Sequence, residues 1–214
     1  MRMGPVPLFS ILLPTYNRAH LLGRALASVR AQSEQDRELL VADDGSSDGT
    51  WPLLQQLAAD DPRIRSWRHS NRGQAASRNR LLGLARGEWV SFLDSDDELD
   101  PGHLAQRRQA IEAQPDVDVW LSPMRVVGSP LVPCMLNPGA LVHVDPCIGV
   151  GRLTVRREAM LSICGFPLLA YGEESALLQP LLASGAVARR LAGRIYGYYR
   201  MHADSITHGR ELSA

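Results

Sequence analysis

Three carboxylates stand within four residues at Asp94-Ser95-Asp96-Asp97, directly after an apolar run that spans residues 89–93. If that run is a buried strand, it delivers the acids at its C-terminal end, where open α/β sheets bind their ligands. Carboxylates this close repel one another unless a cation lies among them, and hard oxygen ligands suit Mg²⁺ or Mn²⁺. The alternative is a solvated acidic turn that caps a helix beginning near Pro101. The residues alone leave both interpretations open.

A second acidic segment follows another apolar run. Residues 38–42 have the pattern of a strand, and the sequence DDGSSDG at 43–49 comes directly after it. Its glycines and serines indicate a tight loop. Two parallel strands that end in carboxylates, one of them with a metal-suited cluster, suggest a nucleoside diphosphate as the ligand, because Mg²⁺ is commonly bound by one or two carboxylates together with phosphates.

These two strands belong to a regular alternation of apolar runs and helical spacing. The predicted strands are residues 8–13, 38–42, 64–69, 89–93 and 117–122. Helices are expected between them, the first with Asn17 as N-cap, the second from Thr50, the third closed by Gly87 and the fourth starting at Pro101. This alternation predicts an α/β fold with one doubly wound, mostly parallel sheet. No GxGxxG follows the first strand, so the dinucleotide fingerprint is missing.

Beyond the fifth strand the pattern is less regular. Residues 123–151 are rich in Pro and Gly without a clear period, which is more typical of a segment that covers a site than of a core. Short helices are expected at 156–163 and 173–184, the second with Pro180 in its first turn or at a kink. Residues 187–200 have the pattern of a strand or hairpin.

Composition excludes several function classes. The formal net charge is zero, which removes the electrostatic basis for a dedicated nucleic-acid binder. All 23 basic residues are Arg, so a P-loop lysine, a Schiff-base lysine and a kinase lysine are ruled out. No apolar stretch approaches the ~18 residues of a membrane span. We therefore expect a cytoplasmic protein with no nucleic-acid partner and no transmembrane segment, while peripheral association with a membrane stays open.

Short motifs stand in a fixed order over the first half of the chain. They are PTYN (14–17), DDGSSDGT (43–50), NRG (71–73), SRN (77–79) and DSDD (94–97). In this order they resemble family 2 of the inverting nucleotide-sugar glycosyltransferases, which have the GT-A fold. GF (165–166), GEE (172–174) and YRMH (199–202) resemble the acceptor-side and C-terminal motifs of that family. The resemblance covers nearly the whole chain.

The resemblance implies one domain over residues 1–214. Its GT-A fold is a single doubly wound, mostly parallel sheet flanked by helices. A Rossmann-like half that binds the nucleotide sugar would occupy residues 1–100 or so, and an acceptor-binding half would occupy residues 101–214.

The resemblance also implies roles on the donor side. The nucleotide-binding residues would be Pro14, Tyr16, Asp43, Asp44, Arg78 and Asp94. Tyr16 would stack on the nucleobase, and Asp44 would accept the ring N–H of that base, with Asp43 near the ribose. Arg78 would help to hold the base or the phosphates, and Asp94 would contact hydroxyls of the ribose or the sugar. For Tyr16 the alternative is an aromatic residue of the core or rim.

The metal and the catalytic base are implied in the same way. Asp96 would bind Mn²⁺ or Mg²⁺, and His202 stands where the family often adds a ligand to the metal or the diphosphate; a packed or solvent-exposed histidine is the alternative. Glu174 matches the catalytic base, which is usually Asp, and an exposed acid at a helix start is the alternative. Residues 175–180 are apolar and end in Pro180, whereas the family usually continues with polar and aromatic residues and an Arg. The acceptor side therefore departs from the family pattern more than the donor side.

These expectations add up to an inverting, metal-dependent glycosyltransferase. It would move a sugar from a nucleoside diphosphate donor, most often UDP, to a saccharide or lipid-linked acceptor, as in polysaccharide or glycoconjugate synthesis. Inversion in one displacement needs a base for the acceptor hydroxyl and a metal for the departing diphosphate. The alternative is a non-catalytic nucleotide-sugar-binding or scaffold protein with a degenerate acceptor site. A sugar-phosphate nucleotidyltransferase would need a Gly-rich phosphate loop and usually a Lys, which the sequence lacks.

Overall fold

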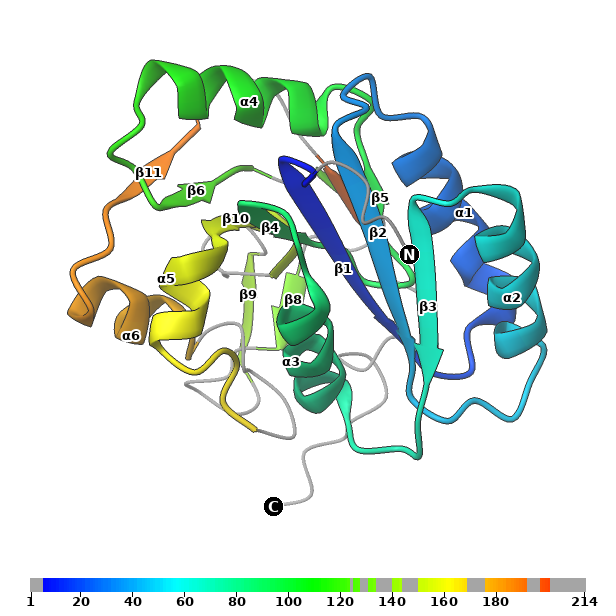
Figure 1. Cartoon of the computed structure of the whole chain (residues 1–214). Coiled ribbons are helices and arrows are strands. Elements are labelled where there is room, and N and C mark those ends of the chain that lie inside the picture. The colour runs from blue at the N-terminus through cyan, green and yellow to red at the C-terminus, as the bar shows by residue number, and fades with distance from the viewer. Residues whose placement is uncertain are drawn as a thin grey trace.

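A sheet of seven strands organises the chain, in the order β11-β6-β10-β4-β1-β2-β3 (Figure 1). The computed structural model describes residues 6–123, 125–127, 131–133, 140–143, 150–168, 176–191 and 197–200. The strands of this sheet are β1 (Phe9–Thr15), β2 (Arg37–Asp43), β3 (Ile64–Arg68), β4 (Trp89–Phe92), β6 (Val119–Leu121), β10 (Leu153–Arg156) and β11 (Ala188–Arg190). The helices are α1 (Ala19–Arg30), α2 (Thr50–Asp60), α3 (Gln74–Leu84), α4 (His103–Ala113), α5 (Arg157–Ser162) and α6 (Leu178–Ala183).

Six of these seven strands run in one direction. β1 pairs in parallel with β2 and β4, β2 with β3, and β6 with β11. β10 runs the other way, because it pairs antiparallel with both β4 and β6. The predicted α/β class with a mostly parallel sheet is therefore confirmed. β10 itself was not predicted, since its four residues are too few to show a period between an irregular segment and a helix.

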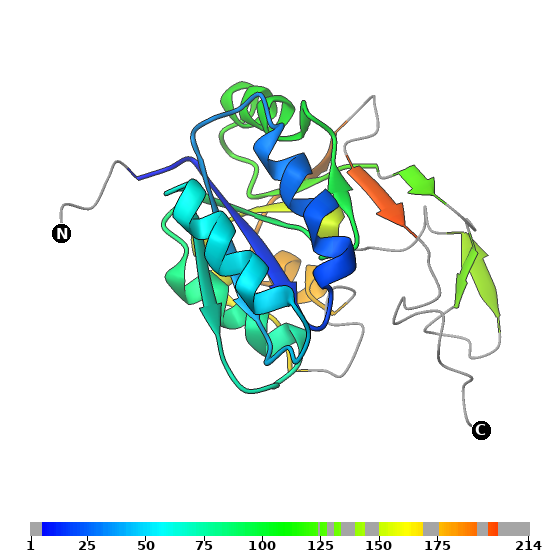
Figure 2. The same ribbon diagram turned by 90° about the vertical axis from the view of Figure 1, so that its right-hand side faces the viewer.

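Helices cover both faces of the sheet (Figure 2). β1 is buried along its whole length, and its side chains alternate between the two faces. Phe9, Ile11 and Leu13 pack in one apolar cluster with α1, which contributes Leu22 and Leu26 among others. Leu12, on the opposite face of β1, packs in a second apolar cluster to which α3, α5 and α6 contribute. The chain thus forms the layered arrangement that burying a sheet on both faces requires.

Two smaller sheets lie beside the main one. β5 (Glu98–Leu99), β12 (Gly197–Arg200) and β7 (Arg125–Val127) form the first, in the order β5-β12-β7. β8 (Leu131–Pro133) and β9 (Leu141–His143) form the second, an antiparallel pair that stands away from the main sheet in Figure 2. Residues 187–200 were predicted as one strand or hairpin; instead β11 and β12 belong to different sheets. Within the described part of the chain, no helix combines the length and the apolar character needed to cross a bilayer.

The ends of the 123–151 segment meet at one point. Ser122 follows β6, and the 3-10 helix η1 (Val150–Arg152) leads into β10. The Ser122 N–H donates to the carbonyl of Arg152 at 2.9 Å, and the Ser122 hydroxyl lies 3.3 Å from the same oxygen. Because β10 is antiparallel to β6 and β4, it begins at the edge of the sheet where those strands end. The segment therefore leaves and re-enters the sheet at the same edge.

Three predicted helix boundaries were wrong. Asn17 is not the N-cap of α1, because the cap position is Arg18 and Asn17 has a positive φ of 51°. α3 ends at Leu84, and Gly87 lies against β1 instead, where a Cβ would come within 2.6 Å of the Ser10 nitrogen. Pro101 precedes α4 by two residues, and its carbonyl accepts a hydrogen bond from the Ser33 N–H.

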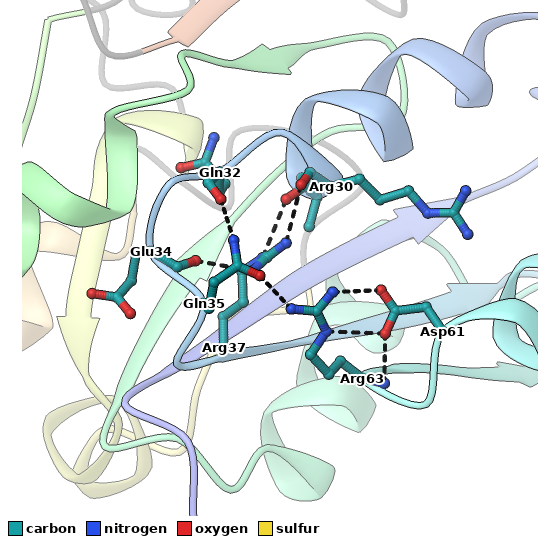
Figure 3. A network of polar contacts seen from close by, with 8 residues as sticks. Arg30, Gln32, Glu34, Gln35, Arg37, Asp61 and Arg63 are labelled. Atoms are coloured by element: carbon teal, nitrogen blue, oxygen red, sulfur yellow. Dashed lines mark hydrogen bonds and ion pairs between the residues drawn. The ribbon is translucent and has the colours of Figure 1, made fainter.

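Arg37, the first residue of β2, closes the C-terminal end of α1 (Figure 3). Its Nε donates to the carbonyl of Val29 at 3.1 Å, and Nη2 donates to the carbonyl of Arg30 at 3.4 Å. Nη1 reaches the carbonyl of Glu34 at 2.9 Å and Oε1 of Gln35 at 3.1 Å. Burial lowers the pKa of Arg37 from its ordinary value. The last carbonyls of a helix have no partner inside it, so this single guanidinium ends α1 and starts β2.

Glu38, the next residue, holds the other face of the sheet together. Its Oε1 accepts from the Ser10 hydroxyl at 2.7 Å and from the Arg86 N–H at 2.8 Å. Its Oε2 lies 2.8 Å from Nη2 of Arg65 and accepts from Nε of Arg86 at 3.1 Å. Burial by itself would raise the pKa of Glu38, but the hydrogen bonds from Ser10 and Arg86 and the charges of Arg65 and Arg86 outweigh it and lower the pKa. The Glu38 carboxylate on β2 therefore bonds to side chains from β1 and β3 and to Arg86, which follows α3.

This cluster makes stability depend on pH. A group whose folded-state pKa lies below its unfolded value stabilises the fold above that unfolded value, and this contribution is lost as pH falls through the folded pKa. We expect Glu38→Gln to lower the unfolding free energy at pH 7 by about 2 kcal/mol. The difference from the parent protein should begin to shrink below about pH 4, the ordinary pKa of Glu in an unfolded chain, and should be lost as pH falls further through the lowered folded-state pKa. Urea denaturation between pH 3 and pH 8 measures it, with the exposed Glu112→Gln on α4 as control. Equal stability of parent and Glu38→Gln at pH 7 would contradict the assignment.

Candidate active site

The predicted donor-side residues come from the carboxyl ends of three neighbouring strands. β1 lies between β2 and β4 and ends at Thr15, with Tyr16 following it. β2 ends at Asp43, and Asp44 stays attached to β1 through its N–H, which donates to the Thr15 carbonyl at 2.9 Å. Asp94 follows β4 after one intervening residue. Parallel neighbours bring these ends to one edge of the sheet, as the sequence predicts.

Not every predicted site residue can be placed. Pro14 is the last residue but one of β1 and is in register with Ala42 of β2. Glu174 and His202, predicted as the base and a metal ligand, lie outside the described residues.

Asp44 is held in a fixed orientation by the backbone of the loop before α3. Its Oδ1 accepts from the Arg72 N–H at 2.8 Å, and its Oδ2 accepts from the Gly73 N–H at 2.9 Å. Nδ1 of His69 lies 3.3 Å from Oδ1. Gly45 allows this approach because its φ is +83°, and a Cβ there would come within 3.0 Å of the Asn71 nitrogen. Asp44 as a whole residue is 5% exposed, and Oδ2 keeps a lone pair beyond the Gly73 contact among the described residues.

Asp43 has a different environment from Asp44. It is fully buried, and its Oδ1 accepts from the Ser46 N–H at 2.9 Å. Its Oδ2 lies 3.4 Å from Nε of Arg68 and has no hydrogen-bond partner among the described residues. Asp43 thus fixes the turn that follows β2. Its predicted position near a ribose stays a prediction.

Asn17 links the loop after β1 to the loop after β2, a role that the sequence analysis missed. Its N–H donates to the Ser46 hydroxyl at 2.8 Å, and its Oδ1 accepts from the Ser47 N–H at 2.8 Å. The positive φ of Asn17 is one that Asn tolerates better than most residues. Tyr16, the preceding residue, is 45% exposed, so its ring stands at the edge of the site. This exposure rules out the core alternative for Tyr16.

Asp48 completes the link between the two loops. Its Oδ1 accepts from the Thr50 N–H at 2.9 Å and its Oδ2 from the Ala19 N–H at 3.1 Å, so one carboxylate serves the first turns of α2 and α1. Burial raises its pKa, but the hydrogen bonds from Thr50 and Ala19 outweigh this effect and lower the pKa. The positive ends of both helix dipoles favour the same charge. Asp48, the last Asp of the motif DDGSSDG, therefore has a structural role: it holds the first turns of α1 and α2 together.

Asp94 is paired with an arginine from α3. Nη2 of Arg78 lies 2.6 Å from Oδ1 of Asp94, and Nε2 of Gln74 donates to the same oxygen at 3.0 Å. Arg78 is 1% exposed, whereas the Asp94 side chain is 26% exposed. The sequence argument that a cation must separate these acids was therefore incomplete, because Arg78 balances Asp94.

The other two acids of the turn, Asp96 and Asp97, differ in burial. The Asp97 N–H donates to the Asp94 carbonyl at 3.1 Å, which closes the turn, and Asp97 is buried at 3% exposure. Asp96 is half-buried. Among the residues that the structure describes, no three side chains of the His, Cys, Asp or Glu type gather in a way that could hold a metal ion. Mg²⁺ and Mn²⁺ fit such a site nonetheless, since they are commonly bound by one or two carboxylates together with the phosphates of a substrate.

Sequence comparison assigns this arrangement to a family. The family described as "Glycosyl transferase family 2" matches residues 10–131. The chain is 42% identical over 106 residues to GalNAc(5)-diNAcBac-PP-undecaprenol beta-1,3-glucosyltransferase of Campylobacter jejuni, covering 49% of this chain and 34% of that protein. It is 40% identical over 96 residues to chondroitin synthase of Escherichia coli, covering 45% of this chain and 14% of that protein. The matches thus span about a third or less of these curated relatives.

Solved structures show the same fold. The crystal structure of S. aureus TarS 1-349 in complex with UDP-GlcNAc superposes with a TM-score of 0.77 at 23% identity, covering 91% of this chain and 58% of that one. The mannosyltransferase PcManGT from Pyrobaculum calidifontis, in complex with GDP-Man and Mn²⁺, gives a TM-score of 0.71 at 21% identity over 90% of this chain and 56% of that one. Since the family match covers more than half of the chain, this protein belongs to glycosyl transferase family 2 and has its GT-A fold.

Proposed function

We propose that this protein transfers a sugar from a UDP-sugar, with inversion and with the help of a divalent metal, to a saccharide or lipid-linked acceptor. One observation carries the proposal: Asp44 and Asp94 stand at the carboxyl ends of β2 and β4, on either side of β1, and each is held by named partners. The names of the relatives agree with it, because one acts on a PP-undecaprenol-linked glycan, one is a polysaccharide synthase and one was solved with UDP-GlcNAc.

The donor would be bound by groups that the fold already orients. Tyr16 offers an exposed ring for the uracil, and Asp44 offers an acceptor for its imide N–H. The backbone bonds from Arg72 and Gly73 fix that carboxylate before the donor arrives. Arg78 holds Asp94, whose exposed part is left to accept from hydroxyls of the ribose or sugar. Preorganisation of this kind reduces the ordering that binding would otherwise require.

The chemistry then needs one proton acceptor and a stabilised leaving group. In a single displacement the acceptor hydroxyl attacks the anomeric carbon and the diphosphate departs from the opposite side, so no protein nucleophile takes part. Glu174 is proposed to take the proton of that hydroxyl. Asp96 and His202 are proposed to hold Mn²⁺ or Mg²⁺, which when bound stabilises the charge of the departing diphosphate.

Metal-dependent nucleotide binding tests the donor site. We expect Mn²⁺ to raise the affinity for UDP about tenfold or more in the parent protein, because a cation between the Asp96 carboxylate and the diphosphate would offset the repulsion between these two negative groups. Asp96→Asn should remove most of this gain while leaving affinity without metal little changed. Isothermal titration with and without Mn²⁺ measures both, and Asp60→Asn, an exposed acid at the end of α2, is the control.

The same samples separate an enzyme from a binding protein. Release of UDP from a panel of UDP-sugars in the presence of Mn²⁺ and a saccharide acceptor reports turnover. Binding without turnover would favour the non-catalytic alternative, and Mn²⁺-independent binding by both parent and Asp96→Asn would count against the metal site.

A further inference from the structure

The Arg78–Asp94 pair rests on an aromatic side chain from the far half of the chain. Cζ of Arg78 lies 5.4 Å from the centre of the Phe166 ring. The same ring meets Phe92 edge-on, with centroids 5.2 Å apart and planes at 88°. Phe92 ends β4 and stands two residues before Asp94. The guanidinium therefore contacts both the carboxylate that it binds and the ring of Phe166, and that ring packs against Phe92 at the end of the strand that precedes the carboxylate.

Phe166 is held in place by Asn79, the residue that follows Arg78 on α3. Oδ1 of Asn79 accepts from the Phe166 N–H at 2.7 Å, and Nδ2 donates to the Phe166 carbonyl at 2.8 Å. One amide thus satisfies both backbone groups of one residue, as a neighbouring strand would. Gly165 allows the close approach: its φ is +77°, and a Cβ there would come within 2.4 Å of Oδ1 of Asn79.

We propose that Asn79 and Phe166 are positioning residues that set the Arg78–Asp94 pair for binding the sugar donor. The inference rests on the proposed function, since it assigns to Asp94 a contact with the donor. Arg78 is almost completely buried, and a buried guanidinium has few orientations when an aromatic face and a carboxylate both contact it. The Asn79 side-chain amide hydrogen-bonds to the backbone of Phe166, and the adjacent Arg78 binds Asp94. Two consecutive residues of α3 thus connect the segment after α5 to the proposed donor site.

In this proposal the GF motif, residues 165–166, contributes to donor binding. Residues 165 and 166 follow α5, which packs on β10 in the acceptor half. Phe166 places its ring against Arg78, and Arg78 in turn holds the Asp94 carboxylate. The two halves of the domain are thereby joined through Asn79 and Phe166, and donor binding responds to substitutions far from Asp94 in sequence.

Phe166→Leu is the informative variant, because it keeps an apolar side chain of similar size and removes the aromatic face. We expect the dissociation constant for UDP-GlcNAc, used as the probe with Mn²⁺, to rise about fivefold to tenfold. Asn79→Asp, which keeps the acceptor for the Phe166 N–H and loses the donor to its carbonyl, should act in the same direction. Met160→Ala is the matched control: Met160 is fully buried in the same apolar cluster, and the substitution lowers stability while leaving donor affinity within twofold.

A double-mutant cycle shows whether the effect acts through Asp94. In the Asp94→Asn background, Phe166→Leu should change affinity for UDP-GlcNAc little, because the group that the ring positions is already altered. In the nucleotide-free protein, solvent exchange of the Arg78 side-chain N–H groups, followed by NMR, should be faster in Phe166→Leu and unchanged in Met160→Ala.

The outcomes distinguish the inference from the function on which it rests. Unchanged exchange and unchanged affinity in Phe166→Leu, with normal binding by the parent protein, would overturn the inference alone. Equal loss of affinity in Phe166→Leu and Met160→Ala would also overturn it, since the effect would then follow stability. A parent protein that binds no uridine nucleotide would overturn the proposed function and with it the donor role of Asn79 and Phe166.

Discussion

Glu174→Gln is expected to lower the turnover number of sugar transfer about 10²-fold or more, the low end of what general-base catalysis contributes. The substitution keeps the size and hydrogen bonding of the side chain but removes its ability to take a proton. A base is needed only when the acceptor oxygen attacks, so the dissociation constant for the donor should stay within twofold of the parent value. Initial rates of transfer and isothermal titration with UDP, on the same preparation, measure the two quantities.

Two further variants locate the base. Glu174→Asp carries the residue that the family usually has at this position, and its shorter side chain should lower the rate if the pocket is built for Glu. Glu173→Gln is the control for a neighbouring acid, and its rate should remain close to that of the parent. Transfer by Glu174→Gln at the parent rate would place the base elsewhere, with Glu173 as the next residue to test.

Asp44→Asn is expected to abolish the preference for uracil. A carboxylate accepts the imide N–H of uracil, whereas the corresponding nitrogen of cytosine carries no proton. We therefore expect the parent protein to bind UDP about tenfold or more tightly than CDP, the difference of one charge-assisted hydrogen bond. In Asp44→Asn the ratio of the two dissociation constants should fall close to one. Competition between UDP and CDP for a fluorescent uridine nucleotide measures this ratio.

The ratio of the UDP and CDP dissociation constants also distinguishes a loss of base recognition from a loss of stability. Asn has one oxygen where Asp has two, so the N–H of Arg72 or of Gly73 loses its acceptor in Asp44→Asn. This loss should weaken the loop and lower the melting temperature, and it affects UDP and CDP alike. Equal affinities of UDP and CDP for the parent protein would show that Asp44 does not read the base.

The donor half was predictable because local patterns decide it. Strands β1, β2 and β4 are buried on both faces, and the spacing of Leu22, Ala25, Leu26 and Val29 in α1 was sufficient to define a helix. Parallel neighbours then place the residues after β2 and β4 at one edge without further information. The position of Asp44 and Asp94 on that edge followed directly from the order of strands and acids.

Roles that depend on long-range partners were not predictable. Asn17 had the residue type of an N-cap, but its Oδ1 accepts a hydrogen bond from the Ser47 N–H, 30 residues away in the sequence. A cation was predicted among the acids of residues 94–97 because nothing in the local sequence shows that Arg78 reaches Asp94. β10 is too short for a period and is defined by its two neighbours alone.

The hydrogen bond between Ser122 and Arg152 marks a junction at which the intervening segment can be replaced while the main sheet keeps its pairing. Both ends of the 123–151 segment are pinned together at the edge that carries the donor residues. A longer or shorter segment between these anchors leaves the register of β6 on β10 intact, and each doubling of its length opposes folding by only about 0.6 kcal/mol. Since this segment was predicted to cover a site, we predict that grafting a foreign segment at this junction changes acceptor preference and leaves nucleotide affinity unchanged.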